Sequence, residues 1–214
     1  MPKRSRRTLL KIGAAVLGVG ILVCAVLALF GKNAALTLPE FHMGKDAMKA
    51  RILIAYATRG GSTAEVAQAM GEVLVQQGYA VDVKPMLTVE SLDGYQAVVL
   101  GSAVRMGSWL GEARDFAKDN KDKLAALPVA IFSVHMLNWE DTPDKTALRE
   151  AYTAKVKEYL TPRVEAFFTG KMDLAKLSFL DRMIAKAVKA VDEDKRDWTL
   201  IRSWAAELGP KLGV

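Results

Sequence analysis

A short polar loop carries the residue types from which the chemistry of this chain can be read. It combines hydroxyl side chains with two glycines, at Thr58, Arg59, Gly60, Gly61, Ser62 and Thr63. The glycines let the backbone turn closely around a ligand, and the three hydroxyls can donate hydrogen bonds to phosphate oxygens. An apparent helix start follows, where free backbone N–H groups and the helix dipole favour an anion. The loop therefore predicts a site for one terminal phosphate.

The commoner nucleotide loops do not fit this stretch. A Walker loop requires G-x-x-x-x-G-K-[ST], and no Gly-Lys pair in the chain is followed by Ser or Thr. The dinucleotide fingerprint G-x-G-x-x-G is also absent. A phosphoacceptor receiver domain would need acidic residues at the end of the preceding apolar run, where Ala55, Tyr56 and Ala57 stand instead. These three classes of site are disfavoured.

The elements that must position the loop alternate between strand and helix. Short apolar runs predict strands at 51–57, 79–85, 95–104, 128–134 and 163–168. Helical spacing of apolar residues predicts helices at 64–77, 111–124, 146–160 and 197–208, the last ended by Gly209 and Pro210. This alternation predicts a doubly wound α/β fold with a five-stranded parallel sheet, whose ligands bind beyond the carboxyl ends of the strands.

One segment is surplus to this pattern. Lys171 to Val191 lies between the fifth strand and the last helix, and its apolar residues have helical spacing beside a basic side. We expect an amphipathic helix here. Such a helix can lie on a membrane surface, flank an apolar ligand or pack on the sheet.

The N-terminus predicts a membrane anchor. Residues 12–30 contain no charge, and 19 helical residues span about 28 Å, close to the ~30 Å hydrocarbon layer of a bilayer. Basic residues precede this run, so the positive-inside bias predicts a single-pass cell-membrane protein with an extracytoplasmic domain. We divide the chain into a basic tip at 1–11, a transmembrane helix or signal anchor at 12–30, a tether at 31–50 and a domain at 51–214 with an insertion at 171–191.

The basic tip also resembles an export signal. Residues 5–11 read S-R-R-T-L-L-K, and the twin-arginine pattern is S-R-R-x-F-L-K, so only Leu9 departs from it. Proteins with such signals cross the membrane already folded. The apolar stretch is longer than a usual signal core and lacks a clear cleavage site, which favours an uncleaved anchor.

Composition excludes several function classes. The formal charge is +6, but five of the 30 basic residues lie in the first eleven positions, and the remaining 25 nearly balance 24 acidic residues. The body is nearly neutral, which argues against nucleic-acid binding. Cys24 is the sole cysteine, so an intramolecular disulfide and a cysteine-based metal site are excluded. We predict no bound metal and assign no catalytic side chain.

The opening loop resembles the flavodoxin signature, in which a strand leads into T-x-T-G-x-T and a helix with alanine four residues on. Thr58, Gly61, Thr63 and Ala67 match, and Tyr56 fills an aromatic position. Gly60 departs, because a hydroxyl residue is usual there. The resemblance implies that the loop binds the phosphate of FMN.

Two later loops correspond to those with which flavodoxins hold the isoalloxazine ring. The first follows the third strand and provides Ser102, Ala103, Val104, Arg105, Met106, Gly107 and Trp109. The second follows the fourth strand and provides Ser133, Val134, His135, Met136 and Asn138. Trp109 is expected either to stack on the flavin or to cap the core of the next helix. Arg105 is expected to pair with the reduced flavin or an acidic substrate group, or to be solvated, and His135 more often satisfies a backbone partner than transfers protons.

Over residues 51–208 the chain resembles the flavodoxin-like, menaquinone-dependent protoporphyrinogen IX dehydrogenases. The resemblance is carried by GSAVRMG, FSVHM, FLDRMIAKAVKA and DWTLIRSWAAEL. It implies an FMN-dependent oxidoreductase that works at the bilayer and passes electrons from a porphyrinogen or another small donor to a membrane quinone. An extracytoplasmic domain conflicts with haem synthesis in the cytoplasm. A membrane-tethered electron-transfer or FMN-binding module without turnover of its own is the alternative.

Overall fold

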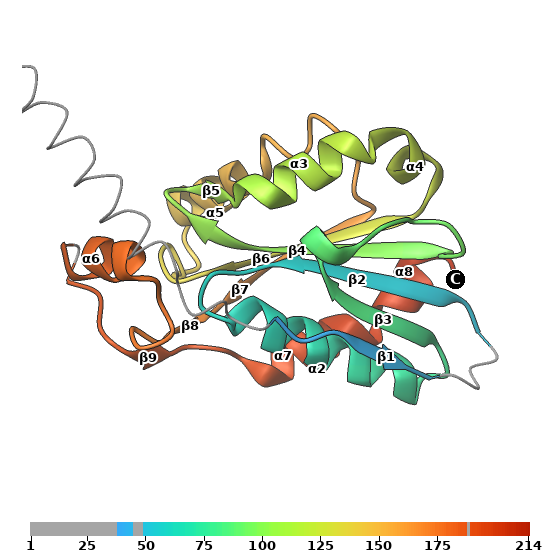
Figure 1. Cartoon of the computed structure of the whole chain (residues 1–214), viewed down its shortest axis with the longest axis horizontal. Helices are drawn as coiled ribbons and strands as arrows, with labels where there is room; N and C mark the ends of the chain where they lie inside the picture. The colour runs from blue at the N-terminus through green and yellow to red at the C-terminus, as the bar shows by residue number, and fades with distance from the viewer. Residues whose placement is uncertain (1–37, 45–48, 188) are drawn as a thin grey trace, which may run out of the picture.

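The computed structural model describes residues 38–44, 49–187 and 189–214, and its centre is a parallel sheet (Figure 1). Five parallel strands lie in the order β3-β2-β4-β6-β7, with bounds β2 (Arg51–Ala57), β3 (Ala80–Pro85), β4 (Ala97–Arg105), β6 (Val129–His135) and β7 (Val164–Thr169). Numbered along the chain, this order is 2-1-3-4-5, that of one common doubly wound fold. The predicted fold class and all five strands are confirmed.

Helices cover both faces of this sheet. On one face lie α2 (Ser62–Gln76), α7 (Trp198–Ala206) and α8 (Leu208–Leu212), and on the other lie α3 (Gly111–Asp119) and α4 (Lys121–Ala126) (Figure 1). β2, β4 and β6 are buried over almost their whole length, as continuous apolar strands covered on both faces must be. Alternate residues therefore enter two cores: Ile54 and Tyr56 belong to the cluster under α2 and α7, and Leu53 and Ala55 to the cluster under α3.

Part of the predicted tether is a strand. β1 (Phe41–Met43) pairs antiparallel with β3 at the edge of the sheet, with His42 opposite Asp82. Asp82 is almost fully buried and accepts hydrogen bonds from Arg51 at 2.6 Å and Tyr95 at 2.6 Å, and it lies 2.6 Å from His42 Nδ1. His42, to which the sequence assigned no role, thus fixes the first strand to the sheet.

Two predicted helices differ in length. The helix predicted over 111–124 is interrupted at Asn120, which has a φ of −107° and a ψ of 14° and donates to the Phe116 carbonyl from both its backbone N–H and its side-chain amide. The helix predicted over 146–160 is α5 (Pro143–Glu150), followed by a 3₁₀ turn, η2 (Ala151–Thr153), and further turns to residue 159. No residue of α5 is buried, whereas Tyr152, Thr153 and Val156 in the turns that follow it are.

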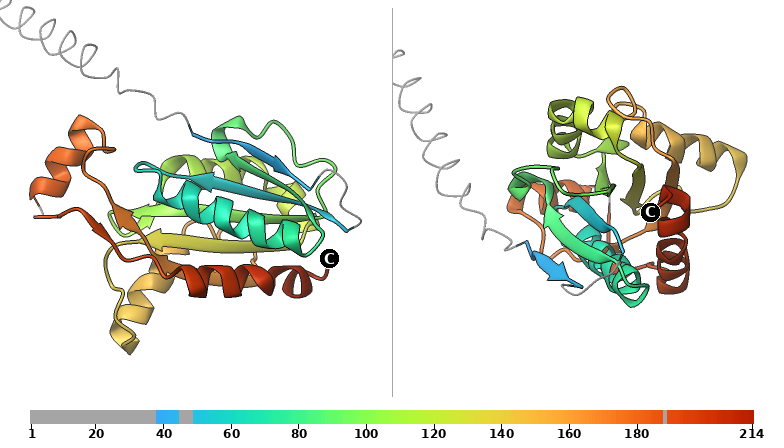
Figure 2. Two further views of the ribbon diagram at one scale, coloured as in Figure 1. Left: turned by 90° about the horizontal axis from the view of Figure 1, so that it is seen from below. Right: turned by 90° about the vertical axis from the view of Figure 1, so that its right-hand side faces the viewer.

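The surplus segment is not one helix. It forms β8 (Lys171–Met172), α6 (Phe179–Ala187) and β9 (Glu193–Asp194), with β8 antiparallel to β9. This insertion projects from the end of the sheet at which the parallel strands finish (Figures 1 and 2). The prediction of a continuous helix over 171–191 is therefore wrong, and among the described residues of that segment only 179–187 are helical.

The C-terminal helix is also divided. Asp197 caps α7 by accepting a hydrogen bond from the backbone N–H of Leu200 at 2.9 Å. α7 ends at Ala206, and Gly209 and Pro210, predicted to end the helix, lie within α8. A proline in the first turn of a helix loses no intrahelical hydrogen bond. Gly209 is needed because a Cβ there would lie 2.0 Å from the Tyr79 hydroxyl oxygen.

The predicted basic tip and transmembrane helix lie outside the described residues. Within the described ranges, the model contains no helix with the length and apolar character needed to cross a membrane.

Candidate functional site

The carboxyl ends of the parallel strands bring the three predicted loops to one edge of the sheet. β2 leads into residues 58–61, β4 into 106–107 and β6 into 136–139, and these three strands are neighbours. In open α/β sheets, this edge is where ligands bind. The structure therefore brings together the loops that the sequence assigns to one cofactor.

The first loop retains its capacity to donate to an anion. Thr58 Oγ1 accepts from the backbone N–H of Gly61 at 3.0 Å, and Ser62 Oγ accepts from the backbone N–H of Lys171 at 3.0 Å. A hydroxyl that accepts can still donate its own hydrogen. Within the described part of the chain, neither hydroxyl donates a hydrogen bond. Both hydrogens are available to a ligand.

Thr63 is the most informative residue of the loop. Its side chain is fully buried, and its hydroxyl oxygen has no hydrogen-bond partner among the described residues. A buried hydroxyl without a partner costs about 1–3 kcal/mol, so a bound ligand that supplies the partner is a physical reason for it. Thr63 stands in the first turn of α2, whose N-cap, Gly61, has a φ of 86° and no side chain to cap the helix. An anion here would satisfy the hydroxyl and the free N–H groups together.

Gly60 and Arg59 complete the loop in different ways. Gly60 is half-buried, and a Cβ built on it would lie 3.5 Å from Leu177 Cδ2 of the insertion. Arg59 points to Glu112 on α3 and forms a two-point ion pair with it, with Nη2 to Oε2 at 2.8 Å. The loop's own cation is thus held by a carboxylate outside the loop.

The second loop is a tight hairpin. β4 turns at Met106 and Gly107, with φ values of 52° and 72°, and returns as β5 (Ser108–Trp109). Ala103 pairs with Val134 of β6, and Val104 pairs with Trp109, so both belong to the sheet rather than to the turn. Met106 is 91% exposed at the tip. The turn presents an apolar side chain and turn backbone at the carboxyl edge.

Other predicted residues of this loop serve the fold. Ser102 is fully buried, donates to the carbonyl of Ala103 and accepts from the N–H of Leu110. Trp109 is 2% exposed, packs in the core under α3 and donates from Nε1 to Ser133 Oγ at 2.7 Å. Trp109 therefore does not face a ligand, and the alternative expectation, that it caps the core of the next helix, fits its place. Arg105 is not simply solvated, because it forms an ion pair of 2.7 Å with Asp181 of α6.

The third loop is ordered by side chains. Asn138 has a φ of 60°, and its amide donates to the Tyr152 hydroxyl at 2.7 Å, while Arg149 donates to the carbonyl of Asn138 at 2.8 Å. Leu137 and Trp139 are exposed, and Met136 is half-buried. Trp139, which we did not assign to the site, is thus an exposed tryptophan on a flavin loop, and Lys195 Nζ lies 4.8 Å from the centre of its ring.

His135 is held as a neutral, satisfied side chain. It is 4% exposed, its Nδ1 lies 2.7 Å from the carbonyl oxygen of Leu137, and its ring lies 5.6 Å from that of Tyr152. Burial lowers the pKa of His135, and the hydrogen bond to Leu137 only partly opposes this. Proton transfer is not required to explain its position.

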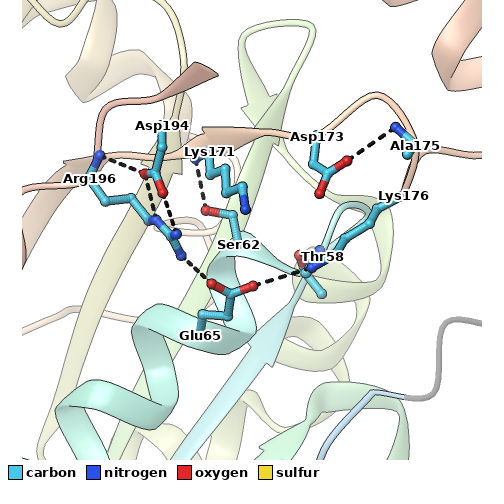
Figure 3. Close-up of polar contacts among 10 residues, drawn as sticks. Thr58, Ser62, Glu65, Lys171, Asp173, Ala175, Lys176, Asp194 and Arg196 are labelled. Carbon is cyan, nitrogen blue, oxygen red and sulfur yellow. Dashed lines mark hydrogen bonds and ion pairs between the residues drawn. The ribbon is translucent and has the colours of Figure 1, made fainter. Parts of the chain in front are cut away.

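The insertion adds charged residues that sequence reasoning did not assign to the site (Figure 3). Glu65, in the first turn of α2, forms ion pairs with Arg196 and, at 3.6 Å, with Lys176. Partial burial favours a higher pKa for Glu65, but the hydrogen bond and charge of Arg196, with Lys176 and Lys171, outweigh it and lower the pKa. Lys171 lies just beyond the carboxyl end of β7. That position in the sequence is the signal from which Lys171 could have been predicted as a site residue.

The sheet order and the one-phosphate loop define a mononucleotide-binding α/β domain. A family model described as a flavodoxin domain matches residues 53–199, and the chain belongs to this family. Membership identifies FMN as the cofactor, and the unpartnered Thr63 hydroxyl and the free hydroxyl hydrogens of Thr58 and Ser62 fit its phosphate.

Similar proteins agree with this assignment. A protoporphyrinogen IX dehydrogenase [quinone] of Escherichia coli K12 is 25% identical over 172 residues, covering 74% of this chain and 94% of that protein. A protein of the same name from Leishmania major is 25% identical, over 73% of this chain and 74% of that protein. Flavodoxin 1 of Bacillus cereus, at 15% identity, has a TM-score of 0.50 over 75% of this chain and 98% of that one, which supports the fold.

Proposed function

We propose that this chain is a membrane-anchored, FMN-dependent oxidoreductase that transfers electrons from a small reduced donor, of the porphyrinogen class, to a membrane quinone. The observation that carries the proposal is the 25% identity to an enzyme named as a quinone-linked dehydrogenase, along 94% of that enzyme's length. The alignment extends over almost the whole of that relative and about three quarters of this chain.

The surface around the flavin loops suits an apolar electron partner. Met106, Leu137 and Trp139 are 91%, 74% and 51% exposed at the carboxyl edge, and Phe179 and Met183 are exposed on α6. Large apolar side chains exposed beside these loops are available to an apolar partner. A quinone or porphyrinogen ring offers the matching apolar face.

The division of work follows from this geometry. When bound, FMN supplies the electron-transfer chemistry, since it can take two electrons from a donor and return them to an acceptor. Thr58, Ser62 and Thr63 would hold the phosphate, while the turns at Met106 and at residues 136–139 would hold the ring. His135 and Trp109 support these turns from within the fold.

Anaerobic turnover tests the proposal. The purified protein, loaded with FMN, is expected to lose its visible flavin absorbance when protoporphyrinogen is added. A menaquinone analogue is expected to restore that absorbance by reoxidising the flavin. Bleaching by a chemical reductant without bleaching by the porphyrinogen would contradict the donor class. Reoxidation by oxygen or a protein acceptor but not by the quinone would favour the electron-transfer module.

The anchor and orientation are separate parts of the proposal. We propose that residues 12–30 span the cell membrane with the domain on the extracytoplasmic side, on the charge pattern of the N-terminus. A reporter that is active only outside the cytoplasm, fused after Val214, is expected to be active. Activity of a cytoplasm-specific reporter instead would show that the domain lies in the cytoplasm. That result would contradict the proposed orientation and remove the conflict with haem synthesis.

A further inference from the structure

The insertion closes over the phosphate loop. The backbone N–H of Lys171 donates to Ser62 Oγ at 3.0 Å, and Leu177 Cδ2 lies 3.5 Å from where a Cβ on Gly60 would be. Gly170 allows this close approach, because a Cβ there would meet Val134 at 2.8 Å and Ser62 Oγ at 3.4 Å. Lys171 and Leu177, near the start of the insertion, therefore lie against the loop predicted to hold phosphate.

The cations near this loop are not equally available. Arg196 is 5% exposed and is held between Asp194, at 2.6 Å, and Glu65. Arg59 is held by Glu112. Lys176 is 43% exposed, and its ion pair with Glu65, at 3.6 Å, is long.

Lys171 differs from these residues. Its charge lowers the pKa values of Glu65 and Asp194, and within the described part of the chain it makes no ion pair of 4.0 Å or less. Its side chain ends beside that of Ser62 (Figure 3). Its backbone is fixed by the bond to Ser62, so the ammonium is tethered beside the loop without a dedicated carboxylate partner.

With Arg59 held by Glu112, the rest of the loop offers a phosphate only neutral donors. Its hydroxyls and the N–H groups of α2 can satisfy oxygen atoms, but a phosphate monoester carries about −1.5 to −2 charge at pH 7. Glu65, in the first turn of α2, is a carboxylate beside that site and is itself paired with Arg196 and Lys176. A further cation near the loop would offset part of the phosphate's charge.

We propose that the insertion is a clasp on the cofactor's phosphate end, and that the Lys171 ammonium is a phosphate-binding group supplied by the insertion rather than by the loop. Lys176 is the second cation of the clasp, shared between Glu65 and the phosphate. This proposal rests on the FMN assignment and not on the identity of the donor or acceptor. It gives the insertion a role in holding the cofactor.

The test compares two flavins that differ in the phosphate. Apo-protein is titrated with FMN and with riboflavin, and the dissociation constants are obtained from quenching of flavin fluorescence. For Lys171→Gln we expect the Kd for FMN to rise about tenfold, the effect of one charge-assisted contact, with the Kd for riboflavin unchanged. Lys171→Arg is expected to keep the wild-type ratio of the two constants.

Lys186→Gln is the matched control, because Lys186 is an exposed lysine on α6 of the same insertion. It removes the same charge and is expected to change neither constant. An equal rise for FMN and riboflavin in Lys171→Gln would overturn the proposal, because it would indicate loss of loop structure only. Unchanged constants for both flavins would overturn it as well.

A second measurement does not depend on the variant folding. In the wild-type protein, salt is expected to weaken FMN binding several-fold more than riboflavin binding, because a partly exposed lysine–phosphate pair is screened. Equal salt dependence for the two flavins would overturn the proposal. Wild-type protein that binds neither flavin would instead contradict the FMN assignment itself, so the two failures are distinguishable.

Discussion

At the scale of single residues, three hydroxyls in one loop have three different roles. Thr58 also holds the loop, because it accepts from the N–H of Gly61, and Ser62 also holds the insertion, because it accepts from Lys171. Thr63 holds nothing in the described chain, although it is fully buried. A bound ligand is therefore the best explanation for the buried Thr63 hydroxyl.

Replacing Thr63 with valine separates ligand binding from folding. Valine keeps the shape and removes a buried hydroxyl that has no partner, so we expect the stability of the apo-protein to stay equal or rise by up to about 1 kcal/mol. The Kd for FMN is expected to rise about tenfold through loss of a hydrogen bond to a charged acceptor. Thr58→Ala is the comparison, and should weaken FMN binding and also destabilise the apo-protein. Wild-type FMN affinity in Thr63→Val would remove Thr63 from the site.

His135 predicts a pH dependence of stability. Burial, which is the larger effect, and the charge of Arg149 lower its pKa, so the unfolded chain binds a proton at higher pH than the folded chain does. Stability is therefore fully present above the unfolded pKa of 6.5 and falls as pH decreases below it, by at most about 1.4 kcal/mol per pH unit.

Urea unfolding of wild type and His135→Asn at pH 7 and at about pH 5.5 checks this expectation. Asparagine can still donate to the Leu137 carbonyl but does not titrate. The stability gap between the two proteins should narrow or reverse at the lower pH. A gap that stays constant would show that His135 titrates alike in both states.

At the scale of elements, the edge strand β1 depends on one carboxylate. Asp82 contacts three polar side chains: Arg51 of β2, Tyr95 just before β4, and His42 of β1. Burial raises the pKa of this carboxyl, but the hydrogen bonds from its three partners outweigh burial and lower it. Asp82 is therefore charged in the folded state, and its contribution is lost only as pH falls through the acidic range.

Asp82→Ala is expected to destabilise the protein by about 2 kcal/mol, because three donors lose one buried acceptor while Arg51 stays half-exposed to water. The free energy of unfolding in urea measures the effect. Asp93→Ala, which breaks an exposed pair with Lys123, is the control and should leave the unfolding midpoint unchanged. Equal midpoints for Asp82→Ala and wild type would contradict the role given to this network.

At the scale of the whole molecule, the insertion is attached to the sheet but is not part of its cores. β8 pairs with β9, so residues 174–191 can be replaced by a short Gly-containing turn that leaves the sheet intact. We expect this deletion to keep the fold and the unfolding cooperativity while FMN binds more weakly and quinone reduction is lost. Circular dichroism, flavin titration and anaerobic reoxidation measure the three outcomes. Full quinone reduction in the deletion variant would contradict the proposed acceptor site.

The sequence by itself determined the sheet. Continuous apolar runs, such as 129–134, and helical spacing, as in 62–76, are local patterns that reflect burial. The loop of glycines and hydroxyl residues lies between the first parallel strand of the sheet and the first long helix. The alternation of strands and helices, and the place of the three predicted loops after their strands, therefore followed from sequence. The helix ends at Asn120 and Ala206 did not follow from sequence, because the helical spacing of apolar residues continues past both.

Only the tertiary structure decided which predicted residues are buried in the core and which are exposed at the carboxyl edge of the sheet. Trp109 and Ser133 look like site residues in the sequence, yet they bond to each other inside the core, while Trp139 is exposed. Periodicity likewise predicted one helix over 171–191, whereas pairing of β8 with β9 and contacts with Ser62 and Gly60 fold that segment over the loop. Side-chain direction and contacts between distant segments depend on the packing of the whole chain, and a local pattern does not contain them.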